Sequence, residues 1–305
     1  MNDISKPFRL TANPYEIVKV LSRVILDRFR AVSGVVRKLR ESGVFDEAVF
    51  SEYSRLLKAV EWVREGEDGV GWRYFAMEGG RLLLAEKLRL RSGMRVLDVG
   101  SGDGWFSIQA GFTYPNVEFH GVELSEEFAE AKEYAKVFGL ANTSFYYFNA
   151  FNMPFPDRCF DRVAMFFSLA NIALNRESAQ RLFIECRRVL KDGGLIGISE
   201  PFLEDFPKEL RGLLVRLYRL SRESCESILR FKDVEEALTE AGFRILEVNV
   251  ITLHTTGSPI HRAKRYLEDY YGCEVPVKLI DRLKVDRVWV RDDPPQYRLI
   301  VAANP

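Results

Sequence analysis

The sequence predicts an α/β fold, in which a doubly wound sheet is built from strands that alternate with helices. Three observations support this prediction. Short apolar runs of strand length recur along the chain, segments with helical apolar spacing lie between several of them, and one strand is joined to the next helix by a glycine-rich loop. Strands that alternate with helices in this order form parallel sheets, because each helix carries the chain back to the starting end of the next strand.

The glycine-rich loop lies within residues 96–104, Val-Leu-Asp-Val-Gly-Ser-Gly-Asp-Gly. Arg95–Val99 is predicted as a buried strand and Trp105–Phe112 as the helix that follows. Glycines let a ligand approach the backbone, and the start of the helix directs unpaired N–H groups at that ligand. A dinucleotide loop has the pattern G-x-G-x-x-G, whereas this loop is D-x-G-x-G-x-G. The carboxylates of Asp98 and Asp103 would repel a pyrophosphate and suit a ligand with an ammonium group.

The loop resembles the first motif of the class I S-adenosylmethionine-dependent methyltransferases, in the branch of ubiquinone-biosynthesis and other small-molecule enzymes. Residues 153–163, "MPFPDRCFDRV", and 188–201, "RVLKDGGLIGISEP", also resemble that family. The resemblance runs from about Gly93 to Glu200. It implies a Rossmann-like methyltransferase fold with a seven-stranded, mostly parallel sheet that ends in an antiparallel hairpin. It also implies methyltransferase activity, with S-adenosyl-L-methionine as the cofactor.

The next strand, predicted at Val117–Val122, ends at a second landmark. Glu123 follows it, about 20 positions beyond the glycines, where an acidic side chain grips a ribose through its hydroxyls. Ser125 is the predicted N-cap of the next helix. By resemblance, Leu124 packs on the adenine and Asn149 accepts a hydrogen bond from the adenine amino group. The complete predicted cofactor set is Asp98, Gly100, Ser101, Gly102, Gly104, Glu123, Leu124, Asn149, Ala150 and Phe166.

The remaining elements follow from apolar spacing and from glycines that end helices. A helix over Asn175–Leu190 is expected to end at the glycine pair of Lys191–Gly194. The helix over Val234–Ala241 is expected to end at Gly242. The other predicted elements are strands at Thr143–Phe148, Phe160–Phe167, Leu195–Ser199, Phe243–Leu253 and Gln296–Ala303, and an inserted helix at Phe206–Leu220.

We expect two parts, a helical extension over residues 1–90 and a methyltransferase domain over 91–305. Inserted helices at about 205–230 and an insertion at about 254–295 interrupt the domain; so long an insertion is usually functional or an interface. The extension packs over the sheet edge, packs on another subunit, or forms a lid. The resemblance favours a lid for Trp72–Gly80, and a homo-oligomer stays open. The candidate substrate or lid residues are Tyr74, Phe151 and Phe202.

The composition indicates which binding partners and which cellular location to expect. Lys plus Arg and Asp plus Glu both number 44, so zero net charge provides no overall attraction to nucleic acid. No apolar window is long enough for a membrane span, and the N-terminus lacks the apolar core of a signal peptide. The four cysteines are scattered, as in a cytoplasmic protein with reduced thiols. No cluster has metal-ligand spacing, so no metal is expected.

The predicted function is methyl transfer from S-adenosylmethionine to a small or medium-sized, partly apolar acceptor, whose identity the sequence leaves open. Aromatic residues near the carboxyl ends of the strands support an apolar acceptor. No catalytic residue is assigned: His120 is expected in the core, and His254 and His261 lie in the insertion. Two alternatives remain. One is an RNA or protein methyltransferase that docks its substrate on the N-terminal helices and residues 254–295. The other is a non-catalytic, cofactor-binding regulatory protein.

Overall fold

The computed structural model describes residues 78–206, 228–252 and 296–305, together with the single positions 30, 208, 211, 212 and 215. These residues belong to two compact units that divide between Tyr147 and Phe148. Tyr74, the insertion at 254–295 and all of the predicted lid except Glu78–Gly80 lie outside the described residues. So does most of the helix predicted at 206–220.

The first unit is built on three parallel strands, β1 (Arg95–Val99), β2 (Glu118–Glu123) and β3 (Thr143–Tyr147). Their order is β3-β2-β1, with Asp98 opposite Gly121 and Gly121 opposite Phe145. All three strands lie within one residue of their predicted positions. Because the strands are parallel, Val99 and Glu123 end at the same edge, which brings the loop after β1 close to the end of β2.

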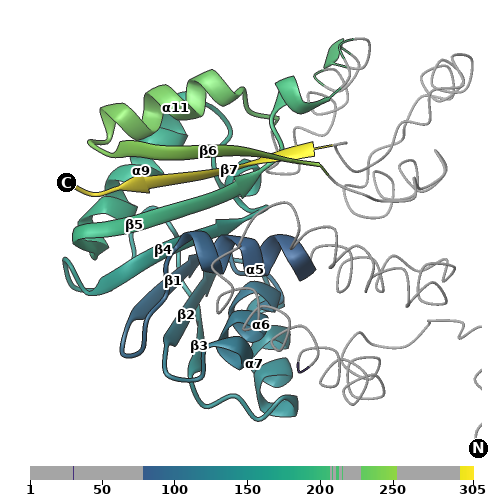
Figure 1. The fold of residues 1–305 in the computed structure, drawn as a ribbon, viewed down its shortest axis with the longest axis vertical. Coiled ribbons are helices and arrows are strands. Elements are labelled where there is room, and N and C mark those ends of the chain that lie inside the picture. Colours follow the sequence, from purple (N-terminus) through teal and green to yellow (C-terminus); the bar gives the residue numbers. More distant parts are fainter. Residues whose placement is uncertain are drawn as a thin grey trace, which may run out of the picture. The chain divides into compact units, whose positions relative to one another are not determined.

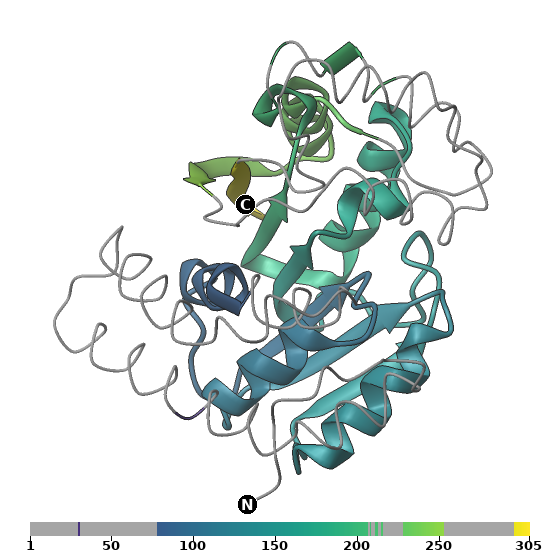
Figure 2. The same cartoon turned by 90° about the vertical axis from the view of Figure 1, so that its right-hand side faces the viewer.

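The described residues of this unit form three helices, α5 (Glu78–Lys87), α6 (Trp105–Thr113) and α7 (Glu127–Val137). Helices α6 and α7 lie on one face of the three strands (Figures 1 and 2). The predicted N-cap at Ser125 is wrong, because the cap position of α7 is Glu126. The Ser125 N–H instead donates to the Glu123 carboxylate at 2.9 Å, which keeps Ser125 in the preceding turn.

The second unit contains the strands β4 (Phe160–Phe166), β5 (Leu190–Glu200), β6 (Arg244–Thr252) and β7 (Gln296–Ala303), in the order β4-β5-β7-β6. Strands β4 and β5 are parallel, whereas β7 runs antiparallel to both β5 and β6. The predicted α/β fold with a seven-stranded, mostly parallel sheet is therefore confirmed, as is its antiparallel hairpin.

Where the second unit is described, its helices are α8 (Leu169–Ile172), α9 (Arg176–Val189) and α11 (Phe231–Glu240), with a short 3-10 turn, η1, at Leu203–Asp205. Helix α9 is strongly amphipathic and buries its apolar stripe. Its N-terminus is closed by a reciprocal capping box between Asn175 and Ser178. Helix α11 ends before Gly242, whose φ of 91° is the left-handed conformation expected of a helix stop. None of the helices in the described ranges is long and apolar enough to span a membrane.

The end of α9 differs from the prediction. The glycine pair was expected to stop this helix, but α9 ends at Val189 and β5 starts at once with Leu190, whose backbone is extended. The stretch Lys191–Gly194 is already part of the strand. Gly193 donates to the Asn304 carbonyl, and Asn304 donates to the Gly194 carbonyl, so these glycines pair with the chain after β7 instead of capping the helix.

Candidate functional site

The loop after β1 has a backbone that favours glycine at three positions. Gly100, Gly102 and Gly104 have φ values of 69°, 51° and 85°, in the left-handed region that side chains disfavour. A Cβ at Gly104 would lie 2.7 Å from both the Ala131 Cβ and a ring carbon of Phe145. The last glycine therefore lets the start of α6 sit against α7 and β3, while the first two shape the exposed turn.

Glu123, at the end of β2, closes over this loop. One carboxylate oxygen accepts the Gly102 N–H at 2.9 Å. The other accepts the N–H groups of Leu124 and Ser125 at 2.7 and 2.9 Å. The carboxylate is half-exposed, and the oxygen that accepts the Gly102 N–H has room for a further donor. Leu124, beside it, leaves 53% of its surface exposed.

Asp98 lies beneath the loop with only 1% of its surface exposed. One oxygen accepts the Ser107 hydroxyl at 2.7 Å. Burial raises the pKa of the Asp98 carboxyl to about 7, the negative charges of Glu123 and Asp103 act in the same direction, and the Ser107 hydrogen bond opposes them. Near neutral pH this group is divided between its two forms, and a cation brought close would favour the ionised one.

Ser101 provides a further sign that the loop is built for a ligand. Its Oγ is buried and has no hydrogen-bond partner within the part of the chain that the structure describes. Buried hydroxyls almost always find a partner, so this atom calls for one from water or a bound molecule. Together, the glycine loop, Ser101 and the two carboxylates fit a small ligand that carries both a cation and hydroxyl groups.

The other predicted cofactor residues belong to the second unit. Asn149 is exposed, and its side-chain oxygen accepts the Phe151 N–H at 2.9 Å, which leaves one further acceptor position. Ala150 is buried. Phe166 is half-buried, with its ring centroid 4.8 Å from that of Phe167. The structure thus groups Asp98, the glycine loop, Glu123 and Leu124 within the first unit, and the roles of all these residues stay predictions.

The candidate substrate residues have different surroundings. Phe151 is half-buried, and the Arg181 guanidinium lies 5.5 Å from the centre of its ring. Phe202 is 0% exposed and packs edge-on against Phe231, at a centroid distance of 5.6 Å. Phe202 is therefore part of the core in this structure, which leaves Phe151 as the more accessible of the two.

An arginine that was not predicted from the sequence organises the segment after β3. The Arg188 guanidinium donates to the backbone carbonyls of Met153 and Phe155 and to the carboxylates of Asp157 and Glu185. Glu185 also accepts the Met153 N–H at 2.7 Å. These bonds fix the loop that begins at Asn149. The spacing of Glu185 and Arg188 on one helix could have predicted that these two side chains pair. It could not have predicted their partners in the loop.

Buried polar atoms at the carboxyl ends of β4 and β5 were also not predicted from the sequence. The hydroxyls of Ser199 and Tyr297 are buried without a hydrogen-bond partner among the described residues. The Tyr297 ring lies 5.1 Å from that of Phe167, whose φ of 52° is unusual for a phenylalanine. Burial raises the pKa of Tyr297 above its ordinary value, so its hydroxyl stays protonated. No sequence pattern distinguished Tyr297 from an ordinary strand residue.

His120 is held in a network on β2. Its ring nitrogens lie 3.2 Å from the Tyr146 hydroxyl and 3.5 Å from the Arg95 guanidinium. Burial and the Arg95 charge lower the pKa of His120 below its ordinary value, so the ring is neutral at pH 7. The side chain is half-buried and stacks on Tyr146. His254 and His261 lie outside the described residues.

Comparison with known proteins places the sequence among methyltransferases. A family model described as "Methyltransferase domain" matches residues 90–242. A demethylmenaquinone methyltransferase of Geobacillus kaustophilus is 27% identical over 225 residues, which cover 68% of this chain and 89% of that protein. The sterol 24-C-methyltransferase ERG6B of Gibberella zeae is 31% identical over 168 residues, which cover 53% of this chain and 43% of that protein.

Solved structures agree on the fold. The [4+2]-cyclase SpnF superposes with a TM-score of 0.56 and 23% identity, covering 75% of this chain and 80% of that one. A SAM-dependent methyltransferase of Methanosarcina mazei has a TM-score of 0.52 and 18% identity, covering 72% of this chain and 96% of that one. At these identities the structural similarity establishes the fold alone.

The raised pKa of Asp98 predicts that stability depends on pH. The folded state binds this proton more tightly than the unfolded state, so stability contributed by Asp98 is lost as pH rises from about 4 through 7. Between pH 5 and pH 8, we expect wild type to lose on the order of 2 kcal/mol of unfolding free energy relative to Asp98→Asn. Urea unfolding of the ligand-free proteins measures this shift, and a difference that stays constant with pH would contradict the assignment.

Proposed function

Since this chain belongs to the methyltransferase-domain family, we propose that it transfers the methyl group of S-adenosylmethionine to a small or medium-sized, partly apolar acceptor. The enzyme class and the cofactor follow from the family, and the nature of the acceptor is the proposal. The observation that most strongly supports methyl transfer from S-adenosylmethionine is the glycine loop of the first unit, with Glu123 closed over it and Asp98 buried beneath it.

The residues of this loop suit the two polar ends of the cofactor. We assign the Glu123 carboxylate to the ribose hydroxyls, because the oxygen that accepts the Gly102 N–H can accept a further hydrogen bond. Asp98 and the unpartnered Ser101 hydroxyl suit the methionine end, whose ammonium would favour the ionised form of Asp98. Exposed Leu124 offers an apolar surface to the adenine, and Asn149 with Ala150 and Phe166 completes the proposed set.

The acceptor is inferred from the relatives and from the aromatic side chains. The two curated relatives described above are named for apolar acceptors, demethylmenaquinone and a sterol. In the second unit, Phe151, Phe166 and Phe167 are half-buried near the ends of their strands, where ligands of open α/β sheets bind. An apolar acceptor would cover these rings.

The proposed mechanism relies on alignment. S-adenosylmethionine supplies a methyl group that its sulfonium already activates. The protein has to hold the acceptor in line with this group and exclude water. His120 is an unsuitable base, because Tyr146 and Arg95 engage its ring nitrogens on the strand. We therefore propose that transfer needs no histidine base.

The alternatives are less well supported. A chain with zero net charge has no general attraction to RNA, and the curated relatives described above are named for small molecules. A non-catalytic role has no specific observation in its favour. We further propose a cytoplasmic location, because the four cysteines are scattered along the sequence, as in proteins with reduced thiols. A homo-oligomer is compatible with these features.

The proposed ribose contact can be tested with Glu123→Ala. Loss of hydrogen bonds to a charged group costs roughly 1.5–3 kcal/mol, which corresponds to about 10- to 150-fold weaker binding. Calorimetry with S-adenosylhomocysteine should show this loss, and NAD should give no heat with wild type. Glu118→Ala is the matched control, since Glu118 begins the same strand at its far end. Wild-type affinity in Glu123→Ala would refute the assignment.

The absence of a histidine base predicts that His120→Gln retains turnover within about tenfold of wild type once an acceptor is known. General acid–base catalysis contributes about 10²–10⁴-fold, so loss of a true base would lower turnover by more than tenfold. Turnover should be compared at saturating cofactor, with thermal unfolding as the control for folding. A loss of about 1000-fold with intact fold and cofactor affinity would establish a histidine base instead.

A further inference from the structure

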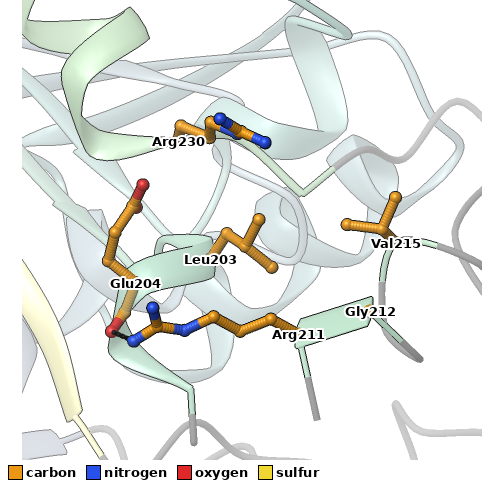
Figure 3. A pocket seen from close by; sticks show the side chains of 6 residues that line it. All are labelled: Leu203, Glu204, Arg211, Gly212, Val215 and Arg230. Carbon is orange, nitrogen blue, oxygen red and sulfur yellow. Dashed lines mark hydrogen bonds between the residues drawn. The ribbon is translucent and has the colours of Figure 1, made fainter. Parts of the chain in front are cut away.

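A pocket lies beyond the carboxyl end of β5, within the second unit. It has a volume of about 390 Å³, and the described residues that line it are Leu203, Glu204, Arg211, Gly212, Val215 and Arg230. Figure 3 shows Leu203 in the middle of the pocket, with Arg230 on one side of it and Arg211 on the other. Small-molecule sites commonly have volumes of 300–1,000 Å³, so one small ligand fits.

The two arginines differ in how they are held. The Arg211 guanidinium donates to the backbone carbonyls of Phe206 and Glu204, at 3.0 and 2.7 Å. These bonds fix its position and use only two of its five N–H donors, so the others remain for a ligand. For Arg230, which is exposed, the described part of the chain records neither a hydrogen bond nor an ion pair. The pocket therefore has one preorganised cation and one adaptable cation.

The acidic residue of the pocket does not cancel both positive charges. The Glu204 carboxylate accepts the Phe231 N–H at 2.9 Å, at the start of α11, where a negative charge is also favoured by the helix. This bond holds Glu204 in a structural role. With two guanidinium groups and one carboxylate, the described lining has a net charge of +1. The remainder of that lining is apolar, from Leu203 and Val215.

We propose that this pocket binds the methyl acceptor through an anionic group, a carboxylate or a phosphate, attached to an apolar body. The anionic group lies against Arg230, the charge of Arg211 on the other side of Leu203 adds to the attraction, and the apolar part beside the anion lies on Leu203 and Val215. This inference rests on the proposed function and names the chemistry of its acceptor. Guanidinium is suited to this role because it stays charged and pairs with the planar or tetrahedral oxygens of such anions.

The test uses the full chain and three probes of equal alkyl length: octanoate, octyl phosphate and octanol. We expect calorimetry to show octanoate or octyl phosphate binding at least tenfold more tightly than octanol, and the stronger of the two identifies the anion. Arg230→Gln should weaken that probe at least tenfold. Lys232→Gln should leave it within twofold, because Lys232 is a neighbouring cation whose side chain is 79% exposed and which does not line the pocket.

A second pair of variants tests the charge without removing an arginine. A Cβ placed on Gly212 meets no atom within 4 Å among the described residues, so Gly212→Gln and Gly212→Glu should both fold. The added carboxylate in Gly212→Glu should weaken the anionic probe at least fivefold relative to Gly212→Gln. Equal binding of octanol and both anions, or unchanged binding in Arg230→Gln and Gly212→Glu, would overturn the proposal.

Binding of S-adenosylhomocysteine to every variant serves as the control for folding and for the cofactor site. If wild type and variants bind it equally while the anions fail to bind, the pocket assignment is wrong and the proposed function stands. If wild type does not bind S-adenosylhomocysteine, the failure lies with the proposed function itself.

Discussion

The hydrogen bond from the Gly102 N–H to the Glu123 carboxylate is the contact on which the candidate site depends. It joins the loop after β1 to the end of β2, two segments that lie 21 residues apart in the sequence. The loop can make this contact because its glycines adopt left-handed conformations, and because Gly104 leaves room for Ala131 and Phe145. The parallel pairing of β1 and β2 places both partners at the same edge of the sheet.

The same arrangement explains the unusual state of Asp98. A carboxylate that faced water would titrate near its ordinary value. Beneath the loop, Asp98 is removed from solvent and placed near two other carboxylates, and hydrogen bonds from the hydroxyl and the backbone of Ser107 oppose the resulting rise in pKa. A site that keeps an acidic group partly protonated favours a cationic ligand, since the cation restores the charge that burial disfavours.

Much of this was accessible from the sequence. The strands of the first unit and the antiparallel hairpin follow from short apolar runs, and the loop follows from its glycine spacing. Sequence patterns failed where a contact from elsewhere in the chain decides the local structure. Glu123 takes the Ser125 N–H and displaces the predicted cap, and Asn304 pairs with the glycines that were expected to end α9. Neither partner is local to the element that it changes.

The most direct test of the central claim is methyl transfer itself. The purified chain would be incubated with S-adenosylmethionine labelled in its methyl group and, separately, with small-molecule, RNA and protein fractions of the source cell. We expect label in the small-molecule fraction, in a product more apolar than a free amino acid, and at least about tenfold less label with Glu123→Ala at limiting cofactor. Label confined to RNA or protein, or absent from every fraction while the cofactor binds, would contradict it.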